Sequence, residues 1–129
     1  MRFFNSLQAA IVLGLVIPVL GVASAANVYI AQSAAGMANG ADCQDAYPYT
    51  FFNTSGNWGA MANQIGPGTT VHLCGTITGL AGSTVLTFQG SGSNGSPITL
   101  IFETGAALNA PYWGTNSGSI SQAAINIDG

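Results

Sequence analysis

Charged side chains are almost absent from this chain. Only 4% of its 129 residues are Asp, Glu, Lys or Arg, against roughly 25% in an ordinary soluble domain. The one basic residue is Arg2, so the chain beyond it has no Lys or Arg against four carboxylates, a formal charge of −4. This composition argues against binding to nucleic acid, whose phosphate backbone requires clustered Lys and Arg.

Long apolar runs are also scarce, and the only one lies close to the start of the chain. It covers residues 9–20, includes Pro18, and is followed by Ala23-Ser24-Ala25. A short apolar core followed by an Ala-x-Ala triplet is typical of a signal peptide, and this core is shorter than a membrane span. We therefore predict a signal peptide over residues 1–25, cleavage near Ala25 or Ala26, and a secreted or cell-surface protein without a membrane anchor.

Cysteine is limited to Cys43 and Cys74. In an oxidising compartment an even number of cysteines favours pairing, so we predict a Cys43–Cys74 disulfide that stabilises the fold by roughly 3 kcal/mol. The alternative is a reactive or metal-binding thiol, which would need a base or further ligands. His72 is the only histidine, and two Cys with one His make a poor zinc site.

Glycine, by contrast, is abundant, with 18 residues. Short β-rich runs alternate with turns rich in Gly, Ser and Asn, which predicts an all-β protein. The expected strands cover residues 26–31, 69–78, 84–89, 97–103 and 123–128. A short helix is expected to start near Asn57 and to end at Ile65, before Gly66-Pro67-Gly68.

A repeat of 27 positions relates Val71-His72-Leu73, Ile98-Thr99-Leu100 and Ile125-Asn126-Ile127. One strand per repeat of this length is typical of a β-solenoid, in which each coil lies on the preceding one. The repeat predicts an outward column of His72, Thr99 and Asn126. The side chains expected to point inward are Val71, Leu73, Ile98, Leu100, Phe102, Ile125 and Ile127.

Residues 65–77, IGPGTTVHLCGTI, resemble the "pGtTV.L.GTi" opening of right-handed parallel β-helix proteins of the pectate-lyase-like superfamily. Residues 96–102 and 125–129 are similar to strands of later coils. The resemblance implies a cap strand and cap helix over residues 26–68 and the first coils of a truncated β-helix over residues 69–129. A β-sandwich is the alternative fold, and it predicts antiparallel hairpins.

The catalytic residues of that superfamily have no counterparts in this chain. Its lyases use Arg or Lys as the base and clustered acids for calcium, and its hydrolases use paired Asp with a nearby His. No Lys or Arg follows Arg2, and Asp128 has no acidic neighbour at the spacing of the repeat. We therefore predict no catalytic, cofactor or metal-binding residue in this piece, while the resemblance allows calcium in a longer protein.

A few single residues have both a functional and a structural interpretation. Tyr112 and Trp113 form a sugar-stacking platform or else pack a loop against the solenoid. His72 has no evident carboxylate partner and is expected to be structural. Asp42 and Asp45 are expected to serve loop turns rather than calcium, and Glu103 is expected to be a solvated turn residue.

Two functional hypotheses follow. In the first, the chain is the N-terminal part of a secreted polysaccharide lyase or hydrolase that acts on acidic glycans, and this piece by itself is inactive. In the second, it is a non-catalytic adhesin or a structural or carbohydrate-binding solenoid, which the scarcity of ionisable side chains favours. The expected partner in both is a polysaccharide, and the composition leaves the oligomeric state open.

Overall fold

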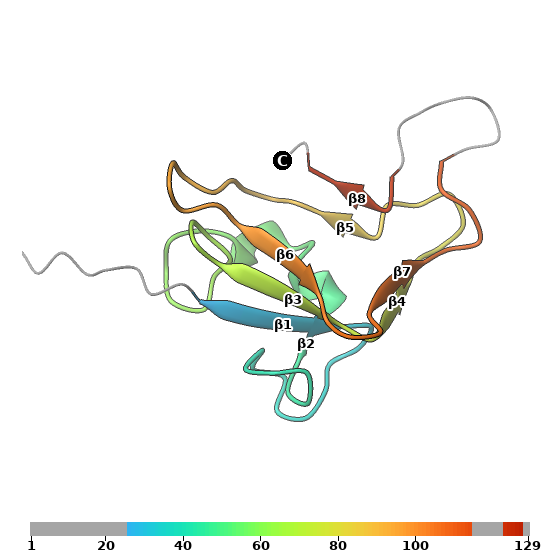
Figure 1. The fold of residues 1–129 in the computed structure, drawn as a ribbon, viewed down its shortest axis with the longest axis horizontal. Coiled ribbons are helices and arrows are strands. Elements are labelled where there is room, and N and C mark those ends of the chain that lie inside the picture. Colours follow the sequence, from blue (N-terminus) through green and yellow to red (C-terminus); the bar gives the residue numbers. More distant parts are fainter. Residues whose placement is uncertain (1–25, 115–122, 128–129) are drawn as a thin grey trace, which may run out of the picture.

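The computed structural model describes residues 26–114 and 123–127 (Figure 1). Its regular elements are mostly β-strands, with two 3-10 helices of three residues each. The predicted signal peptide and Asp128 lie outside the described residues. The elements in chain order are β1 (Asn27–Ala31), β2 (Tyr47–Pro48), η1 (Tyr49–Phe51), η2 (Ser55–Asn57), β3 (Thr70–Cys74), β4 (Thr76–Thr78), β5 (Leu86–Thr87), β6 (Thr99–Phe102), β7 (Ala107–Asn109) and β8 (Ile125–Asn126).

The strands form three small sheets, and every pair of named strands is parallel. The largest sheet has the order β2-β1-β3-β6, and the other two consist of β4 with β7 and of β5 with β8. Parallel pairing distinguishes this arrangement from the antiparallel hairpins expected of a β-sandwich. Figure 1 shows the three sheets as separate ladders joined by loops.

Apolar residues at alternate positions explain how β3 and β4 are built. In β3 the side chains of Val71 and Leu73 are fully buried, while His72 between them points to the other face and keeps a small exposed part. Gly75 separates the two strands with a φ of 67°, a left-handed conformation that glycine adopts without steric cost. The chain therefore turns a corner at this glycine, and Ile77 of β4 points into the same core.

Aromatic residues fill the interior that the three sheets share. Phe52 is fully buried and contacts Trp58 and Phe88 edge to face, with ring centroids 4.8 and 5.1 Å apart. The indole N–H of Trp58 donates a hydrogen bond to the carbonyl of Phe52 at 2.6 Å. One core cluster includes these residues and the inward side chains of β1, β3, β4 and β5.

The repeat of 27 positions predicted the wrong register. Val71 lies opposite Leu100 rather than Ile98, and His72 lies opposite Ile101 rather than Thr99. The third triplet is displaced further, because Ile125 and Asn126 pair with Leu86 and Thr87 of β5. The predicted outward column of His72, Thr99 and Asn126 does not form.

Two of the side chains predicted to point inward are exposed. Phe102 lies opposite the buried Leu73, yet it is 45% exposed because β6 is the edge strand of its sheet among the described residues. Ile127 follows the end of β8 and is 74% exposed. The prediction of burial holds only where another strand or the aromatic core covers the side chain.

The helix predicted to start near Asn57 is absent. Two 3-10 helices, η1 and η2, end at or before Asn57. Residues 57–65 then form a loop closed by a parallel bridge between Trp58 and Ile65. Gly59 and Asn63 have φ values of 154° and 66°, which a right-handed helix does not accommodate. The strand β7 and the short strand β2 were not predicted.

Candidate functional site

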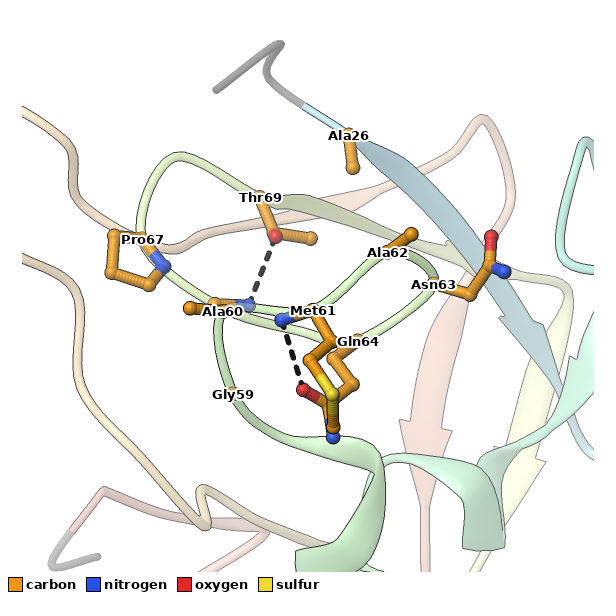
Figure 2. Close-up of a pocket in the computed structure, with 10 residues that line it drawn as sticks. Ala26, Gly59, Ala60, Met61, Ala62, Asn63, Gln64, Pro67 and Thr69 are labelled. Carbon is orange, nitrogen blue, oxygen red and sulfur yellow. Dashed lines mark hydrogen bonds between the residues drawn. The ribbon is translucent and has the colours of Figure 1, made fainter. Parts of the chain in front are cut away.

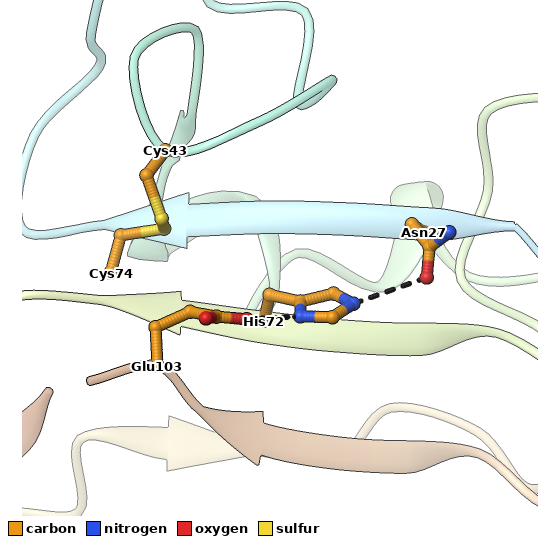
Figure 3. A network of polar contacts seen from close by, with 5 residues as sticks. All are labelled: Asn27, Cys43, His72, Cys74 and Glu103. Atoms are coloured by element: carbon orange, nitrogen blue, oxygen red, sulfur yellow. Dashed lines mark hydrogen bonds and ion pairs between the residues drawn. A yellow bond between two sulfur atoms is a disulfide. The ribbon is translucent and has the colours of Figure 1, made fainter.

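His72 is the centre of a polar cluster on the outer face of the largest sheet (Figure 3). Its Nδ1 lies 2.5 Å from Oε1 of Glu103, which directly follows β6. Its Nε2 lies 3.1 Å from Oδ1 of Asn27, the first residue of β1. The imidazole ring therefore links three neighbouring strands of one sheet.

The ring of Tyr29 stacks on this imidazole. The ring centroids are 4.3 Å apart and the planes differ by 11°. The stack follows from the register, because Tyr29 of β1 and His72 of β3 are directly opposed in parallel strands, and side chains at opposed positions share one face of a sheet. Ile101 of β6 continues this row and is 40% exposed.

The geometry of the cluster favours a structural role for His72. A general base must present a ring nitrogen to its substrate, whereas both nitrogens of His72 already face an oxygen atom and its side chain is only 12% exposed. The carboxylate partner that the sequence did not reveal is Glu103. Glu103 also begins the turn after β6, where its carbonyl accepts from the N–H of Ala106, and its side chain is 37% exposed, so it is a partly solvated turn residue that bonds to His72 as well.

The predicted disulfide between Cys43 and Cys74 is confirmed. The two Cα atoms are 5.5 Å apart and the residues are 31 positions apart in the sequence. Cys74 is the last residue of β3, so the bond holds the loop between β1 and β2 against the end of the central strand (Figure 3).

Asp42 and Asp45 organise that same loop. Asp42 Oδ1 accepts hydrogen bonds from the backbone N–H groups of Gln44 and Asp45, at 2.7 and 2.9 Å. Asp45 Oδ1 accepts a hydrogen bond from the N–H of Met37 at 2.7 Å. Within residues 26–114 and 123–127, no three His, Cys, Asp or Glu side chains are grouped so that they could hold a metal ion.

Residues 26–68 cover one edge of each ladder, through a strand at β3 and through side chains at β4 and β5. The edge of β3 is covered by β1, and the N–H of Thr78 in β4 donates to Oε1 of Gln32 at 2.5 Å. On β5, the amide of Asn53 donates to the carbonyl of Val85 at 2.8 Å and accepts from the N–H of Thr87 at 2.9 Å. We call these covered edges of β3, β4 and β5 the capped side.

The opposite edges belong to β6, β7 and β8, and we call those of β6 and β7 the open side. Among the described residues, β6 pairs only with β3 and β7 pairs only with β4. Two apolar side chains of β6, Ile101 and Phe102, are exposed there. The open side therefore retains backbone groups and apolar surface that another parallel strand could cover.

Tyr112 and Trp113 lie in the loop after β7 and are 46% and 39% exposed. The carbonyl of Tyr112 accepts a hydrogen bond from the N–H of Gly82 at 3.0 Å, so this loop lies beside the turn after β4. That turn presents Leu80, which is also exposed. We call Leu80, Tyr112 and Trp113 the aromatic corner.

A cavity of about 320 Å³ lies beside the loop that replaces the predicted helix (Figure 2). Two polar side chains in its lining have hydrogen-bond partners: Thr69 Oγ1 accepts from the N–H of Gly66, and Gln64 bonds to Met61 and Gly56. These bonds shape the loop, and apart from Asn63 the other side chains of the lining are apolar, so the cavity offers little side-chain chemistry for a ligand. Its lining residues are Ala26, Gly59, Ala60, Met61, Ala62, Asn63, Gln64, Gly66, Pro67 and Thr69.

Comparison with known proteins adds no relative to this description. No family model, curated protein or solved structure matches the chain. Over the residues that the structure describes, no helix combines the length and the apolar character needed to cross a membrane.

Proposed function

We propose that this chain is the N-terminal cap and first coils of a secreted parallel β-helix protein, related to polysaccharide lyases and hydrolases. In this proposal the described part binds polysaccharide and does not cleave it. The observation that carries the proposal is the order of the ladders. Strands β3, β4 and β5 are followed in the chain by β6, β7 and β8, each parallel to its counterpart.

Such an order is what successive coils of a solenoid produce, because each circuit places its strands on the equivalent strands of the previous circuit. The capped side supports the same interpretation, since a solenoid needs a terminal unit that covers its first coil. Secretion is supported by the predicted signal peptide and by the Cys43–Cys74 disulfide, a type of bond that persists in oxidising compartments.

The aromatic corner supports polysaccharide binding. Tyr112 and Trp113 are adjacent aromatic side chains with substantial exposure, and aromatic rings bury a large apolar area in a contact while keeping a polar group at the rim. A sugar ring has apolar faces and polar edges, so it suits such a surface. The His72 cluster contributes no reactive group to this function, because both ring nitrogens are engaged.

The test is affinity gel electrophoresis of the full protein through gels that contain polygalacturonate, other acidic glycans or neutral glycans. We expect at least one polysaccharide to retard the protein, and we expect a Tyr112→Ala/Trp113→Ala variant to lose the retardation. Met37→Ala is the matched control, because it removes an exposed apolar side chain from a loop outside the aromatic corner. Equal retardation of the double variant and of the control would contradict binding at the aromatic corner.

Product formation is measured in the same samples, as new reducing ends and as unsaturated uronides. We expect neither product from the protein. Turnover of any glycan would contradict a non-cleaving role.

The second candidate is a non-catalytic adhesin or structural solenoid. The observation that favours it is the outer face of the largest sheet, where the His72 cluster joins strands instead of offering a reactive group. If no glycan retards the protein, the structural role becomes the better description.

A further inference from the structure

The chain contains two Asn-Gly pairs, Asn39-Gly40 and Asn94-Gly95, and the fold treats them differently. Asparagine followed by glycine is the sequence most prone to spontaneous deamidation, because glycine leaves its own backbone nitrogen unhindered for attack on the asparagine side chain. Asparagine is accordingly counted among the thermolabile residues. The two pairs have the same chemistry, so any difference between them must come from the structure.

Asn94 and Gly95 occupy an exposed two-residue turn before β6. Ser93 and Ser96 close the turn with two backbone hydrogen bonds of 3.0 and 2.9 Å. Within the described residues, neither the N–H of Gly95 nor the side chain of Asn94 has a hydrogen-bond partner, and a Cβ added at Gly95 would meet no atom within 4 Å. Both reacting groups are therefore open to solvent and free to approach each other.

Asn39 and Gly40 are held in place. The N–H of Gly40 donates to the carbonyl of Asp45 at 2.8 Å, and Oδ1 of Asn39 accepts from the N–H of Ala41 at 3.0 Å. Gly40 is buried, and a Cβ added there would collide with the ring of Tyr47. Attack by the Gly40 nitrogen would first require these hydrogen bonds to break, which costs a local opening of the loop.

We propose that Asn94 is a site of spontaneous deamidation in the folded protein and that Asn39 is protected. The backbone nitrogen of Gly95 loses its proton and forms a bond to Cγ of Asn94, while the bond from Cγ to the side-chain nitrogen breaks and ammonia leaves. Water then opens the resulting succinimide to aspartate or isoaspartate. No oxidation or reduction is involved, and the proton removed from Gly95 makes the reaction faster in alkaline buffer.

Deamidation would be conspicuous in this protein because it has so few charges. The chain after Arg2 has four carboxylates and no Lys or Arg, so one additional carboxylate changes its formal charge from −4 to −5. The new charge would lie beside the loop at Gly68, whose N–H donates to the carbonyl of Ser96 at 3.0 Å. The product is therefore expected to separate cleanly from the parent protein on anion exchange.

The test uses the native protein from a host without N-glycosylation, since Asn94-Gly95-Ser96 also matches the glycan acceptor pattern. After incubation in mildly alkaline buffer, the protein is reduced and cut after Asp and Glu. The cuts place Asn39 in the fragment that ends at Asp42, and Asn94 in the fragment 46–103. Deamidation appears as a gain of one nominal mass unit in either fragment or as a new cut after the aspartate formed, and tandem mass spectrometry assigns it to Asn39 or Asn94.

We expect Asn94 to react at least about tenfold faster than Asn39 in the folded protein, since Asn39 reacts only through local opening. In reduced protein unfolded in urea, the two rates should become similar, because both sites are then Asn-Gly pairs in a flexible chain. A Gly95→Ala variant should slow the reaction at Asn94 alone. Equal native rates, or an Asn94 that reacts only in urea, would overturn the proposal.

Discussion

The capped side and the open side of this molecule differ in what pairs with the backbone N–H and C=O groups at the strand edges. On the capped side, single side chains take the place of a neighbouring strand at β4 and β5: Asn53 bonds to the carbonyl of Val85 and the N–H of Thr87, and Gln32 bonds to β4. On the open side, β6 has no such partner among the described residues and exposes Ile101 and Phe102. The comparison shows that specific amide side chains pair the backbone on one side, while on the other side β6 presents apolar side chains instead.

The largest expected loss of stability comes from replacing a phenylalanine in the core, compared with the same substitution on the open side. Phe52→Ala removes a fully buried ring that contacts Trp58 and Phe88, so we expect it to lower the free energy of unfolding by about 3–5 kcal/mol. Phe102→Ala removes a ring that is 45% exposed on β6, and its effect should stay below about 1 kcal/mol. Urea unfolding of both variants provides the measurement, and equal losses would contradict the difference between the buried core and the exposed open side.

Removal of the disulfide should have the next largest effect. The Cys43→Ser/Cys74→Ser variant frees a loop closed over a separation of 31 residues, which is expected to cost roughly 3 kcal/mol. The melting temperature of the variant and of the wild-type protein should be compared with and without reductant. Reductant should lower the wild-type value to that of the variant and leave the variant unchanged. A wild-type value that does not fall with reductant would contradict the prediction, and a variant that melts below the reduced wild type would show that the serines themselves disturb the fold.

Substitution of the capping amide should have a smaller effect. Asn53→Ala leaves the carbonyl of Val85 and the N–H of Thr87 without their partner, so we expect a loss of about 1–3 kcal/mol in the free energy of unfolding. Asn53→Asp keeps the acceptor for Thr87 but loses the donor, and it should also be destabilised despite its nearly identical size. Asn94→Ala is the control at an exposed site, with an expected change within about 0.5 kcal/mol.

A neutral result for Asn53→Ala would contradict the idea that this amide replaces a strand. Destabilisation by the alanine variant but not by the aspartate variant would show that only the bond from Thr87 matters. Amide hydrogen exchange at Thr87 reports the same bond directly, and it should accelerate in the alanine variant more than in the aspartate variant.

The sequence was sufficient to predict most of the strands, the buried face of β3, and which cysteines pair. Val71 and Leu73 alternate with polar neighbours, and this local pattern alone determines the inward face of β3. It does not determine the register, because a shift of two positions leaves every side chain on the same face. The prediction paired Val71 with Ile98, while the structure pairs it with Leu100 two residues further on.

The polar cluster was missed for the same reason. Glu103 reaches His72 only in the register that places Leu73 opposite Phe102, and that register depends on contacts far apart in the sequence. The capping role of Asn53 was also hidden, because Asn in a sequence signals a turn and nothing local reveals a distant strand edge. Both features depend on tertiary packing, which the periodicity of the chain does not encode.

The capped side also restricts how copies of this protein can meet. Endless head-to-tail fibres require two complementary surfaces at opposite ends of one molecule. Here the outermost strand opposite β6 is β2, which is two residues long and contains Pro48, a residue without a backbone N–H to donate. The β6 strand of a second copy would find few backbone N–H and C=O groups to pair with at this edge. We therefore expect the sheet not to extend from copy to copy into long fibres.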